Sequence, residues 1–169
     1  MLEYESFSIY GFRIDYPSSW KIELDPKSER NTGNVVVKSP QKAHIFVSWG
    51  LLEKVKRKYS SLDEQAQESL KRMTKSCQVE EVRVVQSNLI KVSSHKAKFM
   101  HVKIITVKPR LFPIAKPEKS EQEAYSLFLH CSNTKRYFVI YGIIAHDKSR
   151  EYEEIFMNMI KSFQCHMRL

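Results

Sequence analysis

The stretch Tyr137-Phe138-Val139-Ile140-Tyr141-Gly142-Ile143-Ile144-Ala145 decides the fold class, because it is apolar at nearly every position. In a strand, successive side chains point to opposite faces. One face of this strand therefore carries Tyr137, Val139, Tyr141 and Ile143, and the other carries Phe138, Ile140 and Ile144. A strand that is apolar on both faces needs cover on both. We expect a central strand with helices on both sides of its sheet.

Further strands are predicted on the amino-terminal side of this segment. Residues 124–131 form the preceding strand, which the turn Asn133-Thr134-Lys135 joins to it. Residues 79–107 are β-branched and alternating, with breaks near Ser87 and Ser93. This pattern indicates three successive strands in a meander.

Two hairpins are predicted nearer the amino terminus. Residues 7–16 alternate apolar and polar side chains on both sides of Tyr10-Gly11, which is typical of two short strands joined by a tight turn. Residues 35–37 and 43–49 are also β-rich and are separated by a polar turn. Short turns of this kind favour antiparallel pairing.

Two amphipathic helices complete the predicted fold. Ser61 and Glu64 have the spacing of a capping box, and residues 62–77 then carry apolar side chains at helical intervals. Asp147 or Ser149 can cap a second helix, whose apolar stripe consists of Tyr152, Ile155, Phe156, Met159, Ile160 and Phe163. We predict one α+β domain over residues 1–169, with a central, mainly antiparallel sheet flanked by these two helices.

Two segments resemble a known family. The run Gly11-Phe12-Arg13-Ile14-Asp15-Tyr16-Pro17-Ser18-Ser19-Trp20 is similar to the opening pattern G-F-x-I-x-Y-P-x-x-W of the PsbP-like superfamily, and residues 156–163 are similar to its terminal helix. The superfamily includes PsbP of photosystem II, the Ran-binding Mog proteins and the bacterial DcrB-type proteins. The resemblance implies an α/β/α sandwich and a non-enzymatic binding or assembly module. It names no partner, because members bind unrelated molecules.

Charge and segment composition limit the partners and the compartment. The formal net charge of +9 at pH 7 favours anionic partners, which include nucleic acid, anionic lipid and an acidic protein. No apolar run is long enough to span a membrane. The first residues lack the basic start and apolar run of a secretory signal, so we expect a cytoplasmic location.

Metal-binding and catalytic patterns are not recognisable. Cys77, Cys131 and Cys165 are widely spaced and odd in number, which argues against a disulfide framework and a zinc knuckle. His130 and Cys131 are adjacent, and neighbours in a strand point to opposite faces, so they are not expected to ligate one ion. Neither a nucleophile elbow, a glycine-rich phosphate loop nor a paired-carboxylate motif is present. We expect no metal, no cofactor and no enzymatic activity.

A basic run supplies a candidate nucleic-acid site. The run Lys54-Val55-Lys56-Arg57-Lys58-Tyr59 is the densest cluster of charge in the chain. As a solvated loop before the first helix it would have no binding role. As a functional patch, Lys54, Lys56, Arg57 and Lys58 would face phosphates and Tyr59 would stack on an exposed base.

The proline-rich segment 108–120 supplies the leading candidate for a partner-binding surface. Pro109, Pro113 and Pro117 deny this segment ladder hydrogen bonds, so we expect a long exposed loop. Its apolar side chains either fold back onto the domain or stay exposed to anchor a protein partner. The candidate residues in the loop and its basic flanks are Lys108, Arg110, Leu111, Phe112, Ile114 and Lys116.

Overall fold

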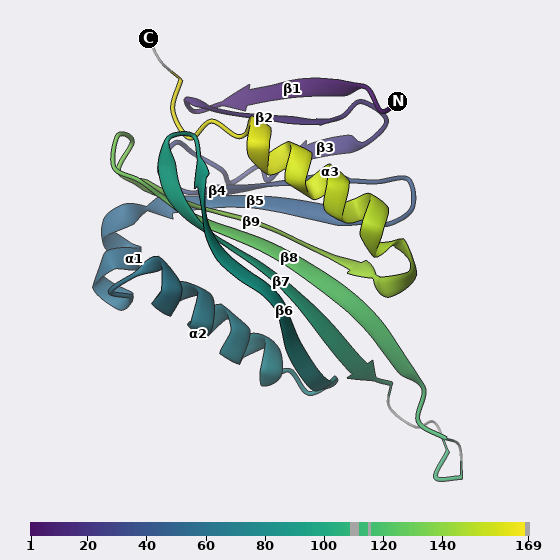
Figure 1. Cartoon of the computed structure of the whole chain (residues 1–169). Helices are drawn as coiled ribbons and strands as arrows, with labels where there is room; N and C mark the ends of the chain where they lie inside the picture. The colour runs from purple at the N-terminus through teal and green to yellow at the C-terminus, as the bar shows by residue number, and fades with distance from the viewer. Residues whose placement is uncertain (109–111, 115, 168–169) are drawn as a thin grey trace.

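The structure is a computed structural model that describes residues 1–108, 112–114 and 116–167. Its main feature is a seven-stranded sheet in the order β3-β4-β5-β9-β8-β7-β6, in which every neighbouring pair is antiparallel (Figure 1). The strands are β3 (Lys21–Leu24), β4 (Gly33–Lys38), β5 (His44–Leu51), β6 (Val79–Val92), β7 (His95–Val107), β8 (Lys119–Cys131) and β9 (Arg136–Ala145). As predicted, β9 lies inside the sheet, between β5 and β8.

A separate hairpin of β1 (Tyr4–Ile9) and β2 (Phe12–Pro17) begins the chain. Its two turn residues, Tyr10 and Gly11, have φ values of 50° and 83°. Positive φ at both positions matches the right-handed twist of the flanking strands, which is why such turns close tight hairpins. The predicted hairpin around Tyr10-Gly11 is therefore confirmed.

Helices cover both faces of the large sheet, which gives the α+β architecture predicted from the sequence. These helices are α1 (Leu52–Lys58), α2 (Leu62–Thr74) and α3 (Ser149–Ser162), and a short 3-10 helix, η1 (His146–Lys148), precedes α3. The side chains of β8 separate the two faces. Tyr125 and Leu127 pack in the cluster that contains α3 and β2, whereas Ala124 and Phe128 pack with α2.

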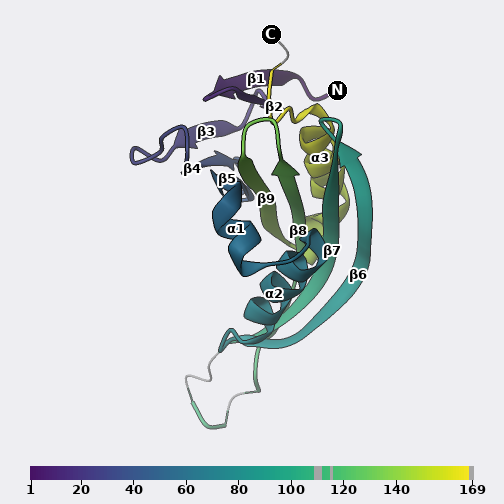
Figure 2. The same ribbon diagram turned by 90° about the vertical axis from the view of Figure 1, so that its left-hand side faces the viewer.

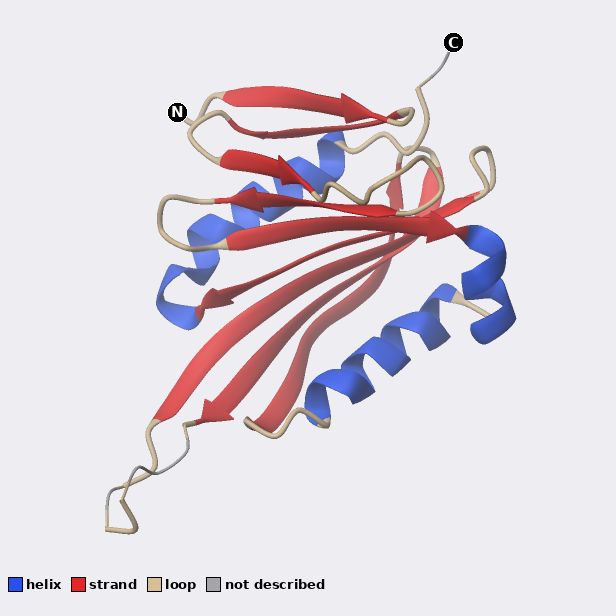
Figure 3. Cartoon of the chain, turned by 180° about the vertical axis from the view of Figure 1, so that it is seen from behind, coloured by secondary structure: helices blue, strands red, loops and turns tan. Residues whose placement is uncertain are grey.

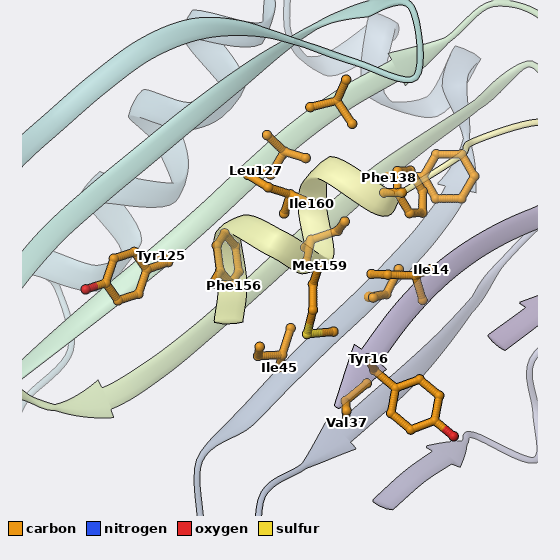
Figure 4. Close-up of a cluster of buried hydrophobic side chains, with 14 of the residues drawn as sticks. Ile14, Tyr16, Val37, Ile45, Tyr125, Leu127, Phe138, Phe156, Met159 and Ile160 are labelled. Carbon is orange, nitrogen blue, oxygen red and sulfur yellow. The ribbon is translucent and has the colours of Figure 1, made fainter. Parts of the chain in front are cut away.

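The larger core lies between the sheet, α3 and the hairpin (Figure 4). The α3 stripe buries Tyr152, Ile155, Phe156, Met159 and Ile160, as its spacing predicts. The close-up shows Ile14 and Tyr16 of β2 beside Met159 and Ile45, so the hairpin and α3 share one apolar interior. Trp20, the last residue of the run that resembles the PsbP-like opening pattern, is also buried there.

Three local predictions are wrong. Residues 79–107 form two long strands instead of three, because β6 continues through Ser87 and Asn88 with a register shift between Val84 and Gln86. A bulge absorbs the irregular residue without ending the strand.

The predicted caps of α3 are also wrong. Lys148 occupies the N-cap position and makes no side-chain hydrogen bond there. Strand β3 had no sequence prediction.

The basic run is helical instead of a loop, which corrects the third assignment. Helix α1 holds Lys54 to Lys58 because Leu52 and Val55, one turn apart, bury their side chains while the basic residues point outward. Such a short helix depends on this packing for its stability.

Phe12 provides a test of the core. Its side chain is fully buried, and its ring packs against the rings of Trp49, Phe138 and Phe163 at centroid distances of 5.0, 5.5 and 6.0 Å. We expect Phe12→Ala to lower the free energy of unfolding by about 3 to 5 kcal/mol, because it leaves a cavity among aromatic rings. The matched control is Phe112→Ala, at an exposed position, which should change it by about 0.5 kcal/mol or less. Equal effects in urea denaturation would contradict this packing.

Candidate functional site

The sheet face that carries α1 and α2 is only partly covered. Figure 3 shows this face with α1 and α2 at one side and no helix in front of β5 and β9. Tyr141 and Ile143 of β9 point to this face and are 36% and 43% exposed. The prediction that both faces of this strand are covered is therefore wrong over its second half.

Aromatic side chains extend this uncovered area onto β5. Phe46 pairs in register with Tyr141, and their rings stack at a centroid distance of 5.0 Å and an interplanar angle of 15°. His44 pairs with Ile143 and meets the Phe46 ring edge-on at 6.2 Å. We call these four residues, His44, Phe46, Tyr141 and Ile143, the sheet patch. It is a flat apolar surface built on two paired strands.

A basic rim borders the sheet patch on the side of β3 and β4. Lys38 pairs with His44 in register, and Lys21 pairs with Lys38. Both ammonium groups contact the carboxylate of Glu23. Hydrogen bonds from Lys21 and Lys38 lower the pKa of Glu23 to about 2. Two cations thus share one anion, which leaves the rim with net positive charge.

The proline-rich connection between β7 and β8 leaves the sheet at its end farthest from the two chain termini (Figure 2). Phe112 and Ile114 are 71% and 97% exposed, so these apolar side chains do not fold back onto the domain. Lys108 and Lys116 are exposed as well, and Lys108 forms an ion pair with Glu118 at 3.0 Å. Two further candidates, Arg110 and Leu111, lie outside the described residues.

The basic run on α1 borders a surface hollow of about 360 Å³ between α1 and α2. Lys54, Lys58 and Arg72 line this hollow. Tyr59, the predicted stacking residue, is already engaged: Lys58 lies 5.3 Å from its ring centroid, and Arg72 donates a hydrogen bond of 2.7 Å to its hydroxyl. The sequence-based picture of Tyr59 as a free stacking platform is not supported.

Two histidines contact the buried carboxylate of Glu123, near the carboxyl-terminal end of β9. His101 Nε2 lies 3.0 Å from Glu123 Oε1, and His146 Nδ1 lies 3.3 Å from Glu123 Oε2. His101 also stacks on Tyr125 at 4.4 Å. Burial raises the pKa of Glu123, but hydrogen bonds from Ser149 and His101 outweigh this effect and hold the pKa below its ordinary value. The imidazole of His101 is hydrogen-bonded to Oε1 of this buried carboxylate, whereas Oε2 has no hydrogen-bond partner among the described residues.

His130 and Cys131 point to opposite faces of the sheet, as expected of strand neighbours. His130 Nε2 lies 2.8 Å from Gln65 Oε1 of α2, while Cys131 is buried on the α3 side. There Cys131 meets Cys165, and hydrogen bonds from Cys165 and Thr134 lower the pKa of Cys131 below its ordinary value, whereas the pKa of Cys165 is raised. The fold thus brings together two cysteines whose wide spacing in the sequence argued against a shared site.

One group in the described part of the chain has the make-up of a metal site. It consists of His95, Cys131, Cys165 and His166. Sequence reasoning missed it because the ligands come from three separate segments. The usable signal was Cys165-His166, a second adjacent cysteine–histidine pair besides His130-Cys131.

Comparison with known proteins establishes the fold. No protein-family model matches the chain, and no curated protein matches it. Among solved structures, the solution structure of cyanobacterial PsbP (CyanoP) from Synechocystis sp. PCC 6803 is similar, with a TM-score of 0.60, 11% sequence identity, and coverage of 97% of this chain and 93% of that one. The chain has a PsbP-like fold.

The match supports the family resemblance of the opening and closing segments at the level of architecture. At 11% identity it shows the fold alone and transfers no site residue. Within the described residues, no helix is both long and apolar enough to span a membrane.

The basic run on α1 can be tested with mixed-sequence oligonucleotides. We expect binding to be feeble at physiological salt and unchanged when Lys54, Lys56, Arg57 and Lys58 are all replaced by Gln, because Tyr59 is occupied and Arg57 already has Glu53 at 3.9 Å. If the four residues do contact phosphates, the log-log salt slope of about −0.7 to −0.9 per phosphate would flatten in the variant. Tight binding that survives physiological salt and disappears in the variant would establish the nucleic-acid function.

The lowered pKa of Glu123 predicts acid sensitivity. A carboxyl group whose pKa is lowered on folding contributes stability above its ordinary pKa, and this stability is lost as the pH falls through the lowered value. We expect the free energy of unfolding to fall in acid more steeply for the wild type than for Glu123→Gln. Urea denaturation over a pH series measures this slope. Exposed Glu154→Gln on α3 serves as control and should keep the wild-type slope.

Proposed function

We propose that the protein is a non-enzymatic binding or assembly module, which holds a protein partner against the sheet patch. The observation that carries this proposal is exposed Tyr141, stacked on half-buried Phe46, beside exposed Ile143. The PsbP-like fold supports a binding module without naming what is bound. The expected cytoplasmic location stays a prediction.

The composition of the sheet patch resembles the centre of a protein interface. Tyrosine and phenylalanine are enriched in such centres, where they bury large rigid surfaces at a small cost in side-chain entropy. The stack is also preorganised, because both rings stand on paired strands of one sheet. A partner would therefore gain apolar contact without ordering a loop.

The basic rim favours an acidic partner. Lys21 and Lys38 share the single carboxylate of Glu23, so an acidic side chain on the partner could take up the second cation. The net charge of +9 adds long-range attraction of the same sign. Charge at the rim would guide association, while the apolar patch would hold the complex.

The loop between β7 and β8 is proposed as a second contact. Phe112 and Ile114 present apolar side chains to solvent with Lys108 and Lys116 on either side. Loops that carry exposed apolar residues on a rigid scaffold commonly serve binding. This loop repeats the combination found at the sheet patch, apolar side chains beside positive charge.

Affinity capture from the native cell extract, with and without nuclease, tests the proposal. We expect a protein partner that is retained after nuclease treatment. Ile143→Glu should weaken capture by about thirtyfold or more, which corresponds to about 2 kcal/mol, because it puts a charge into the apolar contact. Double replacement by Phe112→Asp and Ile114→Asp should weaken it as well if the loop contributes.

The matched control is Val85→Glu. Val85 is an exposed apolar strand residue on β6, outside the sheet patch, and its replacement adds the same charge. Capture by this variant should equal that of the wild type. Equal losses for Ile143→Glu and Val85→Glu, or complete loss of the partner after nuclease treatment, would refute binding at the sheet patch.

A further inference from the structure

Three segments that are far apart in sequence come together where β7 begins and β8 ends. His95 is the first residue of β7, directly after the turn from β6, and Cys131 is the last residue of β8. Cys165 and His166 follow α3 in the carboxyl-terminal tail. The tail is held in place by a hydrogen bond of 3.1 Å from the Cys165 backbone N–H to Ser93 Oγ in that turn. The juxtaposition thus depends on tertiary structure alone.

The four side chains turn one potential ligand atom each toward a common centre. Cys131 Sγ lies 3.6 Å from His95 Nε2 and 3.6 Å from His166 Nδ1, and Cys165 Sγ lies 3.2 Å from His166 Nδ1. All four ligand atoms lie within 4.8 Å of one another. The two imidazole rings meet at an interplanar angle of 76°, so they approach the centre from different directions.

The sulfur–nitrogen separations are close to the edge lengths of a zinc coordination tetrahedron. Zinc–sulfur bonds of about 2.3 Å and zinc–nitrogen bonds of about 2.0 Å place ligand atoms about 3.3 to 3.8 Å apart at tetrahedral angles. Two of these three sulfur–nitrogen distances fall inside this range, and the Cys165 Sγ–His166 Nδ1 distance of 3.2 Å lies just below it. Two thiolates and two imidazoles in a tetrahedron favour zinc over other first-row metals.

A buried arginine lies on the strand next to Cys131. Arg136, which pairs with Cys131 in register, is 1% exposed and donates a hydrogen bond of 3.1 Å from Nη1 to the Arg30 carbonyl, whereas its Nε and Nη2 atoms have no hydrogen-bond partner among the described residues. Arginine is almost never buried this deeply without compensating charge. Zn²⁺ bound by two thiolates and two neutral imidazoles carries no net charge, so the ion would add no repulsion beside this guanidinium. Thiolate is the form that binds zinc.

We infer that His95, Cys131, Cys165 and His166 form a structural zinc site, which fastens the carboxyl-terminal tail to the β6–β7 turn and the end of β8. Four protein ligands complete the tetrahedron and leave no open position for a water molecule or a substrate, so the role is structural. Both cysteines are fully buried, as expected of such a site. A surface cavity of about 470 Å³ beside His166, lined by Ser93, Ser94, Gln164 and Met167, offers an entry path.

Two other uses of the cluster fit less well. A Cys131–Cys165 disulfide would leave both histidines without a role. Simple packing of neutral thiols would not explain why four potential ligand atoms lie within 4.8 Å of one another. Zinc coordination uses all four side chains.

Metal titration of the full chain, purified without a polyhistidine tag, reduced and stripped by a chelator, tests the site. We expect one equivalent of Zn²⁺ to bind in competition with a chromophoric chelator and to raise the melting temperature. Co²⁺ should give the intense visible bands of a tetrahedral ion together with thiolate-to-metal charge transfer. A stripped protein that unfolds and refolds on adding one equivalent of Zn²⁺ would support the site equally, since metal-binding energy is then folding energy.

Variants locate the ion. Loss of an outer-shell partner already weakens metal affinity by about 10- to 100-fold, so loss of a ligand in Cys131→Ser or His166→Ala should weaken it by more than about 100-fold. His166 lies in the tail and is only half-buried, so its variant is the safer of the two for folding. The matched control, Cys77→Ser, removes the exposed cysteine and should bind Zn²⁺ like the wild type.

Several results would overturn the inference. One is failure of the reduced wild type to bind Zn²⁺ more tightly than its His166→Ala variant. Another is a Co²⁺ spectrum without charge transfer, and a third is loss of binding in Cys77→Ser. A protein that contains a Cys131–Cys165 disulfide when isolated, and that takes up no metal after reduction, would also exclude the site.

Discussion

The packing of Phe12 joins the two ends of the chain to the sheet between them. Its ring contacts Trp49 on β5, Phe138 on β9 and Phe163 after α3. The opening hairpin and the closing helix therefore bury each other against the same strands. The hairpin depends on such packing, because a two-stranded hairpin is marginal by itself.

The two faces of the sheet are covered to different extents. On the α3 side, alternate residues of β9, including Phe138 and Ile140, are fully buried. On the opposite side, α2 packs over β6, β7 and β8, and α1 reaches only the start of β9. Tyr141 and Ile143 lie beyond both helices and stay exposed. The sheet patch is thus a consequence of where α1 and α2 end.

Residue patterns anticipated the elements whose signals are local. The alternation of Tyr137 to Ala145, the Tyr10-Gly11 turn and the apolar stripe of α3 each report a period that the backbone imposes by itself. The predictions are wrong where tertiary contacts determine the local structure or the exposure of a side chain. The short helix α1 exists because Leu52 and Val55 find apolar partners, and the exposure of Tyr141 depends on the reach of a helix elsewhere in the chain. A period-two pattern reports apolar character on both faces without showing that both are covered.

The carboxyl-terminal tail connects the core to the cysteine cluster. After Phe163 has packed on Phe12, Gln164 and Arg13 exchange two backbone hydrogen bonds of 2.9 Å, and this pairing directs the next residue, Cys165, back toward β8. The contacts that close the core therefore also set the position of the cluster. An ion held there would bind only after the tail has docked, so its binding free energy would stabilise that docking. The cluster and the sheet patch are consequently separable, because the first secures the fold on the α3 side and the second remains open on the other face.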